Sequence, residues 1–202
     1  MFRLICLCIG YCIGCIETAH VVGKIWKVDL RQHGSGNLGT TNALRVLGKK
    51  AGALVFIGDI LKSVIAFLIC YGIFKDHATI AGLFGSVGAV LGHNYPFYLH
   101  FKGGKGIAVM IGMTAALAFT TDIRLAFPNA IIGFGMAFAT RYVSVGSLLF
   151  ALTLPISCYL LGYEQEIVLV TACVSALAFW RHRTNIKKLL NGTENKFGSK
   201  KK

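Results

Sequence analysis

Residues 52–74 read GALVFIGDILKSVIAFLICYGIF, an apolar run in which Asp59 and Lys62 are the only charged residues. As a helix with a rise of about 1.5 Å per residue, this run is about 34 Å long, which exceeds the ~30 Å hydrocarbon core of a bilayer. It shows no alternation of polar and apolar residues of the kind that marks a half-buried strand. The run therefore predicts a transmembrane helix.

Similar apolar runs fill most of the remaining chain. They lie at 4–23, 78–99, 106–121, 124–140, 144–162 and 166–181. The composition agrees, because 55% of the residues are hydrophobic, 14% are charged and the mean hydropathy is +0.65. The sequence therefore predicts an all-α, polytopic membrane bundle of about seven transmembrane helices, forming one domain over residues 1–202. Since the runs at 106–121 and 124–140 are short, a five-span bundle with a partly re-entrant region stays an alternative.

The charge distribution predicts the orientation. The formal net charge is +13, with 21 Lys and Arg against 8 Asp and Glu. In the seven-span arrangement, Arg3, Lys75 and Arg124 lie on one side of the membrane and Lys62 lies within a span. All the other lysines and arginines lie in the loops and the tail on the opposite side. By the positive-inside rule these basic loops and the C-terminus face the cytoplasm and the N-terminus lies outside. The excess charge also indicates anionic partners, and its dispersal over short loops argues against a nucleic-acid partner.

Three charged residues within the predicted spans need a structural explanation. Glu17, Asp59 and Lys62 are costly in a membrane unless they pair or face the bundle interior. Lys62 follows Asp59 by three residues, so the two can pair on one helix face. A structural ion pair and a direct functional role both stay open. The Cys12–Cys15 spacing fits a CxxC pair, but without a second pair or a histidine partner we predict packing residues.

The first basic loop contains GSGNLGTTN at 34–42, followed by Arg45. The glycines fit G-x-G-x-x-G, but a dinucleotide site also needs a preceding strand and a βαβ unit, which the sequence lacks. Glycines nevertheless allow successive backbone N–H groups to converge on an anion, and a following helix N-terminus adds a favourable dipole. The loop therefore predicts an anion site.

Two further segments carry the same kind of chemistry. GHNYP at 92–96 precedes FKGGKG at 101–106, where no Ser or Thr follows Lys105, so an NTPase is disfavoured. The lysines and glycines suit an anion held against the next helix. In the tail, His182 and Asn185 share one helix face, and Ser144 offers a hydroxyl at the same membrane face. No G-x-S-x-G or HExxH motif is present, which favours direct transfer between bound substrates.

Taken together, GSGNLGTTNALRVLG at 34–48, GHNYPFYLHFKGGKGIA at 92–108 and RHRTNIKKLLNGTENKF at 181–197 resemble the PlsY family of bacterial acyl-phosphate:glycerol-3-phosphate acyltransferases. The resemblance implies an enzyme of phospholipid biosynthesis in the bacterial inner membrane, with its active site facing the cytoplasm. It implies acyl transfer from acyl phosphate to the 1-hydroxyl of sn-glycerol 3-phosphate, giving lysophosphatidate and phosphate. Acyl-carrier protein, coenzyme A, metal and other cofactors are not expected.

The resemblance also implies the site residues. It gives catalytic roles to Ser35, Asn37, Arg45, Lys105, His182 and Asn185. It gives substrate-binding roles to Gly34, Gly36, Gly39, Thr41, Asn42, His93, Gly103, Gly104 and Ser144. Two residues depart from the family pattern, with Cys15 in place of a common serine and Leu38 in place of a common proline. The alternative function is an anion or phosphate-ester transporter, but such proteins usually place their sites at the midplane of paired halves.

Overall fold

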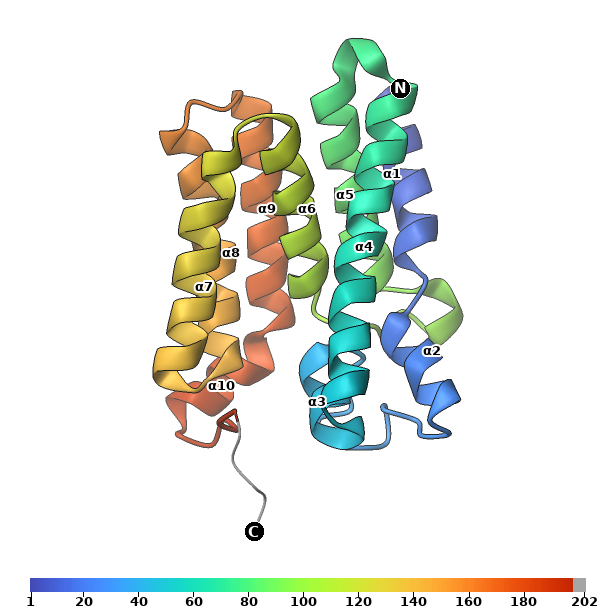
Figure 1. The fold of residues 1–202 in the computed structure, drawn as a ribbon, viewed down its shortest axis with the longest axis vertical. Helices are drawn as coiled ribbons and strands as arrows, with labels where there is room; N and C mark the ends of the chain where they lie inside the picture. The colour runs from blue at the N-terminus through green and yellow to red at the C-terminus, as the bar shows by residue number, and fades with distance from the viewer. Residues whose placement is uncertain (198–202) are drawn as a thin grey trace. The chain divides into compact units, whose positions relative to one another are not determined.

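The computed structural model describes residues 1–197 of the chain, which are helical and contain no β-strand (Figure 1). The chain divides into two compact units, Met1–Thr121 and Asp122–Lys202.

The first unit is a packed set of helices (Figure 1). Its α-helices are α1 (Phe2–Gly14), α2 (Thr18–Ile25), α3 (Thr40–Leu47), α4 (Lys49–Ile73), α5 (Ala78–Asn94) and α6 (Ile107–Thr120). The short 3-10 turns η1 (Lys75–His77) and η2 (Phe97–Leu99) lie before and after α5. Helix α5 packs against α1 and α4, and α6 packs against α4. The region predicted as one span, 78–99, therefore ends as a helix at Asn94.

Glycines bring α1 and α5 into backbone contact. A Cβ on Gly10 or Gly14 would overlap backbone atoms of Gly85 or Ala89 on α5. A Cβ on Gly92 would likewise overlap the backbone of α1 at Tyr11. Small residues at such crossings are how membrane helices approach closely without a hydrophobic driving force. This contact places the C-terminal end of α5, which carries His93, beside the end of α1.

The first predicted span is two helices, which differs from the single helix expected over 4–23. Helix α1 ends at Gly14, α2 begins at Thr18, and Glu17 between them is extended, with φ −78° and ψ 96°. The break exposes the carbonyl of Ile16, which accepts a hydrogen bond from the Lys62 ammonium over 3.2 Å. A buried ammonium needs such acceptors, so the break follows from tertiary contacts rather than from local propensity.

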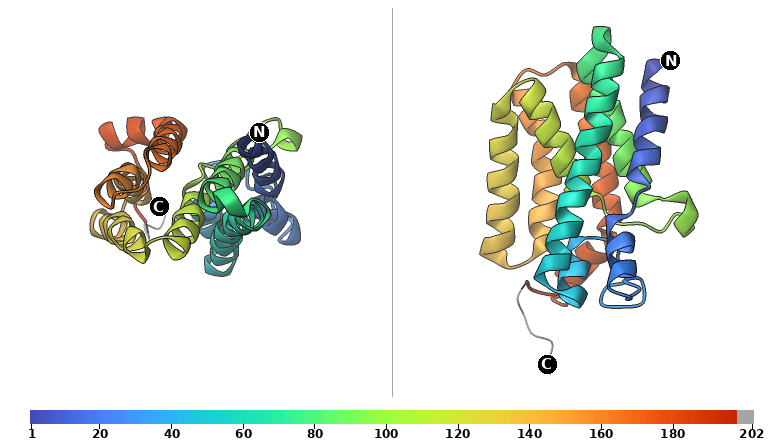
Figure 2. Two further views of the ribbon diagram at one scale, coloured as in Figure 1. Left: turned by 90° about the horizontal axis from the view of Figure 1, so that it is seen from above. Right: turned by 45° about the vertical axis from the view of Figure 1, so that its right-hand side comes forward.

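The second unit consists of η3 (Ile123–Leu125), α7 (Ala126–Thr140), α8 (Val143–Leu160), α9 (Gln165–Arg181) and α10 (Arg183–Leu190) (Figure 2). Helix α8 packs against both α7 and α9. Gly133 and Gly146 allow close approach of α7 and α8, since a Cβ on Gly146 would overlap the carbonyl of Gly133. Pro128 lies in the first turn of α7, where its missing N–H breaks no helical hydrogen bond.

Each of the seven predicted spans contains a helix. Four helical stretches are long and apolar enough to cross a bilayer, namely Phe2–Ile25, Lys49–Ile73, Ile123–Thr140 and Val143–Leu160. Helix α6, with 14 residues, is about 21 Å long and too short to cross an average hydrocarbon core by itself. The all-α fold is therefore confirmed, while the count of seven spans stays a prediction.

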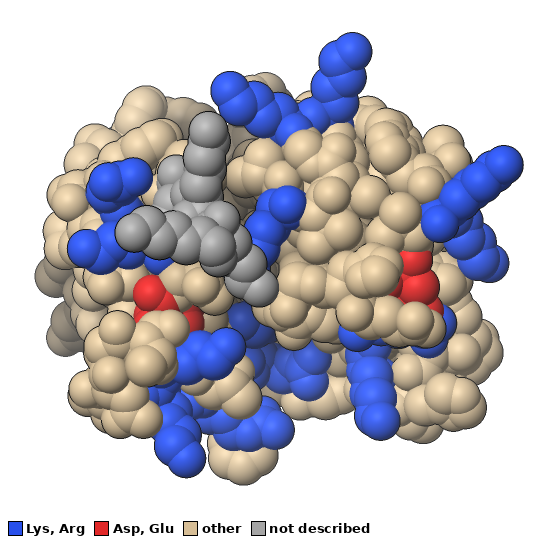
Figure 3. All heavy atoms as spheres, turned by 90° about the horizontal axis from the view of Figure 1, so that it is seen from below, with Lys and Arg blue, Asp and Glu red and all other residues tan. Residues whose placement is uncertain are grey.

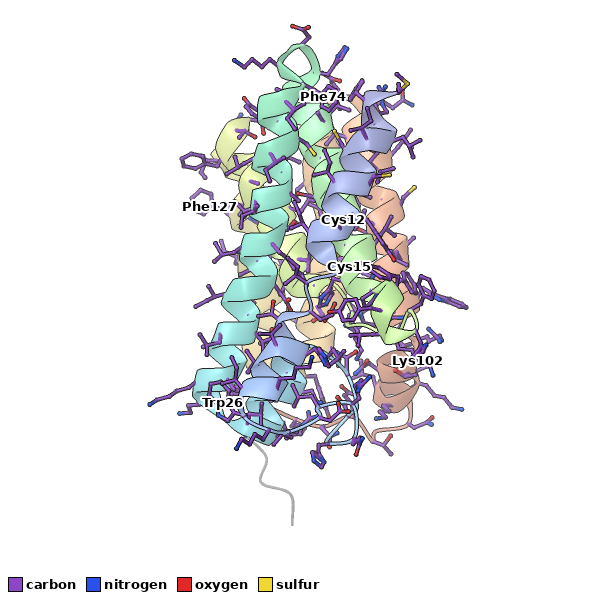
Figure 4. The ribbon with its side chains drawn as sticks, turned by 90° about the vertical axis from the view of Figure 1, so that its right-hand side faces the viewer. Cys12, Cys15, Trp26, Phe74, Lys102 and Phe127 are labelled. Carbon is purple, nitrogen blue, oxygen red and sulfur yellow. The ribbon has the colours of Figure 1, made fainter. Side chains whose placement is uncertain are left out.

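Within the first unit, the basic loops lie at one end. Trp26 lies near that end of α2, and Phe74 lies at the opposite end, after α4 (Figure 4). Exposed Trp26, beside Lys24 and Lys27, is typical of a residue at a membrane–water interface. Figure 3 shows many lysine and arginine side chains and few acidic ones on the face seen from below. All cysteines within residues 1–197 are free; Cys15 is buried, as expected for a packing residue, whereas Cys12 is exposed, so the predicted packing role does not hold for it.

Candidate active site

The side chain of Asn42 organises the first glycine-rich loop. Asn42 is buried on α3, and its Oδ1 accepts a hydrogen bond from the Ser35 N–H over 2.8 Å. Its Nδ2 donates to the carbonyls of Leu30 over 3.0 Å and His33 over 3.1 Å. Gly34 has φ +64° and would place a Cβ onto Asn42 Oδ1. The amide of Asn42 is thus engaged by the loop backbone, so its first role is to fold the loop.

These hydrogen bonds determine which donors the loop offers to an anion. The N–H groups of Ser35, Gly36 and Gly39 already donate to Asn42 Oδ1, the His33 carbonyl and the Asn37 carbonyl. Helix α3 begins at Thr40, and the N–H groups of Asn42 and Ala43 donate to the Gly39 carbonyl over 3.1 and 3.0 Å, so the Thr40 and Thr41 N–H groups are those of this first turn without an acceptor within the helix. Thr40 also has a buried hydroxyl without a hydrogen-bond partner among the described residues. Donors for an anion therefore lie chiefly at the start of α3, where Thr41 is half-buried and the helix dipole is favourable.

The loop before the α3 N-terminus is preceded by an ion pair. Arg31 donates to both carboxylate oxygens of Asp29, over 3.0 Å from Nε to Oδ1 and 2.8 Å from Nη2 to Oδ2. This bidentate pairing and the Arg31 backbone N–H lower the pKa of Asp29 from 3.8 to about 2. The carboxylate therefore stays ionised at neutral pH and remains paired with the Arg31 guanidinium.

The second glycine-rich loop folds back onto the end of α5. The N–H of Gly103 donates to the carbonyl of Asn94 over 3.2 Å, and the N–H of Gly104 donates to that of His93 over 3.0 Å. A Cβ on Gly103 would overlap the His93 carbonyl. Gly106, with φ +84°, then starts α6, so the half-buried Lys105 side chain is carried by a backbone that α5 holds in place.

The two glycine-rich loops meet at Gly104. A Cβ on Gly104 would overlap the His93 imidazole at Nε2 and lie 2.5 Å from the carbonyl oxygen of Leu38. Glycine is therefore the residue that lets the backbone of the first loop, at Leu38, approach the backbone next to Lys105. The structure thus brings the 34–42 loop, His93 and the 103–106 loop together in the first unit. Arg45 is exposed on α3, and Asn37 is half-buried beside Gly39.

Beneath Gly104 lies a cluster of buried charged groups. The Lys62 ammonium is 3.0 Å from Asp59 Oδ1, which confirms the predicted pairing of these residues, and 2.8 Å from His93 Nδ1. Glu17 Oε1 lies 3.1 Å from the same His93 nitrogen. The sequence indicated that Asp59, Lys62 and Glu17 face the interior but gave no means of placing Glu17 against His93.

In the second unit, Glu194 connects two of the predicted site residues. Its Oε1 accepts a hydrogen bond from the Ser144 hydroxyl over 3.1 Å and one from Asn185 Nδ2 over 2.8 Å. His182 is buried, and its Nδ1 donates to the Ala178 carbonyl over 2.8 Å. That hydrogen bond places the proton of a neutral imidazole on Nδ1. Sequence reasoning missed Glu194, although a single acidic residue within a basic tail was its available signal.

Comparison with known proteins decides the family. The family model described as glycerol-3-phosphate acyltransferase matches residues 4–192. The chain belongs to the glycerol-3-phosphate acyltransferase family. It is 42% identical over 197 residues to the glycerol-3-phosphate acyltransferase of Halalkalibacterium halodurans, covering 95% of this chain and 94% of the relative. It is 41% identical over 202 residues to that of Thermoanaerobacter pseudethanolicus, covering 99% and 98%.

Solved structures agree with this assignment. The chain matches the crystal structure of PlsY, an integral membrane glycerol 3-phosphate acyltransferase, in its glycerol 3-phosphate form, with a TM-score of 0.88 and 36% identity over 97% of this chain and 96% of that one. The lysophosphatidic acid form matches with a TM-score of 0.86 and 35% identity, covering 97% and 95%. This glycerol-3-phosphate acyltransferase is therefore a membrane enzyme, and the transporter alternative has no support.

Proposed function

We propose that this acyltransferase takes its acyl group from acyl phosphate and transfers it to the 1-hydroxyl of sn-glycerol 3-phosphate, without acyl-carrier protein or coenzyme A. The relatives are named for glycerol 3-phosphate, and the matched PlsY structures are of its glycerol 3-phosphate and lysophosphatidic acid forms. The chemistry of the first unit, which presents anion donors on two loops, supports acyl phosphate as the donor in this proposal.

The observation that carries this proposal is the meeting of the two glycine-rich loops at Gly104. The N-terminus of α3 suits one phosphate-bearing group, and Lys105 supplies a cation beside it. A reaction between two phosphorylated substrates brings several negative charges together, so such donors lower the barrier by balancing charge. Gly34, Gly36, Gly39 and Thr41 shape or line the acyl-phosphate site in this proposal, with Asn42 and Asn37 supporting it.

The chemical step needs little from a side-chain base. The 1-hydroxyl oxygen of glycerol 3-phosphate attacks the carbonyl carbon of the mixed anhydride, a C–O bond to the glycerol forms, and the C–O bond to phosphate breaks. Inorganic phosphate leaves, and the hydroxyl proton passes to a phosphate oxygen of the donor. Arg45 and Lys105 offset the charge of the two substrates, and Ser35 donates a hydrogen bond. Positioning and charge stabilisation supply the rate in this scheme.

From the resemblance to the family, Ser144, His182 and Asn185 are also assigned to binding glycerol 3-phosphate in this proposal. Glu194 orients the hydroxyl of Ser144 and the amide of Asn185 through one carboxylate oxygen. The Ala178 carbonyl orients the ring of His182. Side chains held in this way lose little entropy on binding, which suits a polar substrate.

We further propose one catalytic domain of seven spans in the bacterial inner membrane, with the N-terminus outside and the glycine-rich loops facing the cytoplasm. The family model covers both units, which supports a single functional domain. The positive-inside pattern of the loops supports the orientation.

Phosphate release by the purified protein in detergent tests the donor. The assay supplies palmitoyl phosphate with and without glycerol 3-phosphate, and palmitoyl-coenzyme A in a parallel reaction. We expect phosphate and lysophosphatidate only when palmitoyl phosphate and glycerol 3-phosphate are both present. Lys105→Ala should lose at least about 100-fold in kcat/KM, while the exposed Lys102→Ala stays near wild type. Equal turnover with the coenzyme A ester would overturn the donor assignment, and full activity of Lys105→Ala would overturn the site.

A further inference from the structure

Lys62 is a buried cation near the middle of α4, and the proposed reaction gives it no role. Its ammonium donates to the Ile16 carbonyl at 3.2 Å, to Asp59 Oδ1 at 3.0 Å and to His93 Nδ1 at 2.8 Å. An ammonium has three N–H donors, so these contacts use all of them. The shortest contact goes to an imidazole rather than to the carboxylate, so an ion pair alone does not explain the position of Lys62.

The carboxylates around Lys62 keep its side chain an ammonium. Asp59 Oδ1 lies 3.0 Å from Lys62 Nζ, and Glu17 Oε1 lies 3.9 Å from it. Asp59 Oδ1 also accepts a hydrogen bond from the Thr18 hydroxyl over 3.0 Å. An opposite charge at this distance favours the charged form of a buried group. The ammonium can then only donate, because it has no lone pair.

The contact with Lys62 fixes the tautomer of His93. Nδ1 accepts from the ammonium, so the lone pair of this nitrogen is occupied and the proton of a neutral imidazole lies on Nε2. Glu17 Oε1 lies 3.1 Å from Nδ1 but has no hydrogen bond to it. His182 shows the opposite tautomer, since its Nδ1 donates to the Ala178 carbonyl.

The Nε2 edge of His93 faces the junction of the two glycine-rich loops. A Cβ on Gly104 would overlap Nε2 and would lie 2.5 Å from the carbonyl oxygen of Leu38. Within residues 1–197, no hydrogen bond to Nε2 is present, although His93 is only 2% exposed. Lys105, the proposed cation for substrate, follows Gly104 directly in the chain. His93 therefore directs an unused N–H donor at the place where an anionic substrate is proposed to bind.

We infer that Lys62 is a positioning residue, which holds the proton of His93 on Nε2 and so gives the loop junction a hydrogen-bond donor for an oxygen of glycerol 3-phosphate. The other tautomer would turn a lone pair toward the same anion and repel it. A donor that is in place before the substrate arrives costs no reorganisation during the reaction. This inference rests on the proposed binding of glycerol 3-phosphate beside Lys105.

Nitrogen NMR of the intact enzyme in detergent reports the tautomer directly. Protein labelled with 15N at its histidines is compared with His93→Gln, which identifies the His93 signals. We expect an unprotonated Nδ1 and a protonated Nε2 for His93. We expect the reverse for His182, which serves as an internal reference. A protonated Nδ1 in His93 would overturn the inference.

A matched pair of variants tests whether Lys62 sets this tautomer. Both carry Asp59→Asn, which keeps an acceptor for the Thr18 hydroxyl, so the buried ion pair is removed as a unit, a change that is often tolerated. Lys62→Met fills a similar volume without a donor, so Nδ1 should take the proton and donate to Glu17 Oε1, 3.1 Å away. Lys62→Gln is one bond shorter but still donates through its amide, so it should keep the proton on Nε2.

The kinetics of the two variants separate positioning from stability. With a lone pair at the junction, the KM for glycerol 3-phosphate should rise by about tenfold in the Lys62→Met variant and by less in the Lys62→Gln variant. The KM for palmitoyl phosphate should stay within about twofold of wild type in both, because the α3 N-terminus is proposed to hold that substrate. A parallel rise in both KM values with a lower melting temperature would show that Lys62 has only a structural role. Equal KM values for glycerol 3-phosphate in the two variants would also overturn the inference.

Failure of the inference is distinct from failure of the proposed function. The protonation pattern of His93 is measured without substrate, so an Nε2 that stays protonated in the Lys62→Met variant refutes the role of Lys62 whatever the kinetics. Lys105→Ala in the same kinetic assay tests the site itself, because an unchanged KM for glycerol 3-phosphate there refutes the proposed binding beside Lys105.

Discussion

Gly104→Ala is the substitution whose effect the structure defines most directly. The added Cβ would overlap the His93 imidazole and lie 2.5 Å from the Leu38 carbonyl oxygen. An ordinary contact between carbon and oxygen needs about 3.4 Å, so the two loops must separate by about 0.9 Å. Because a displacement of about 1 Å in a catalytic group costs on the order of 100-fold, we expect kcat/KM to fall by about 100-fold.

The assay is lysophosphatidate formation from palmitoyl phosphate with varied glycerol 3-phosphate, alongside thermal unfolding of the same preparation. Gly72→Ala is the matched control, since a Cβ there meets no atom within 4 Å and alanine favours the α4 helix. We expect Gly72→Ala to have wild-type kinetics. If Gly104→Ala is folded and keeps more than about a third of wild-type kcat/KM, the contact between the loops is not part of the active arrangement.

Three other substitutions test separate parts of the structure. Asn42→Ala removes three hydrogen bonds that fold the first loop, so we expect the free energy of unfolding to fall by about 2–4 kcal/mol and activity to fall with it. Asn42→Asp should be intermediate because it keeps only the acceptor for the Ser35 N–H. Thermal unfolding and phosphate release measure the two effects. Glu194→Ala leaves the Ser144 hydroxyl and the Asn185 amide without their shared acceptor, so the KM for glycerol 3-phosphate should rise by about tenfold, and an unchanged KM would contradict the orienting role of Glu194. The pKa of Asp29 is lowered to about 2, so its stabilising contribution is present above about pH 4 and is lost as the pH falls through 2. Asp29→Asn should therefore be less stable than wild type near neutral pH, by less than about 1 kcal/mol because the pair is exposed. In pH-dependent unfolding, the stabilities of the two proteins should converge at low pH.

Hydropathy predicts the positions of the helices because burial in lipid is decided by composition over about 20 residues. The run at 52–74 corresponds closely to α4, which spans Lys49–Ile73. The break at Glu17 was not predictable in the same way. It depends on Lys62, 45 residues further along the chain, whose ammonium needs the carbonyl that the break releases. A tertiary contact of this kind leaves no periodic signal in the sequence.

In the candidate site, too, the sequence predicts some features and leaves to tertiary contacts others that it cannot predict. Glycines and lysines mark the loops in the sequence because only certain residues can present backbone donors to an anion. Their composition cannot show that Asn42 folds its own loop rather than donating to a ligand, since an amide serves either purpose equally well. Nor can it show that Glu194 serves Ser144 and Asn185, because the Ser144 partner lies 50 residues away in the chain.

Gly104 can be recognised in the sequence, but its role depends on tertiary contacts. In the sequence it is one glycine of a flexible-looking run, and in the structure it is the place where Leu38 and His93 contact the same backbone. A side chain at that position would push the first loop, at Leu38, away from the backbone next to Lys105. The buried charges beneath the loop pack against the same histidine, since the Lys62 ammonium lies 2.8 Å from His93 Nδ1, so the position of the ring against Gly104 depends on tertiary contacts that the sequence does not reveal.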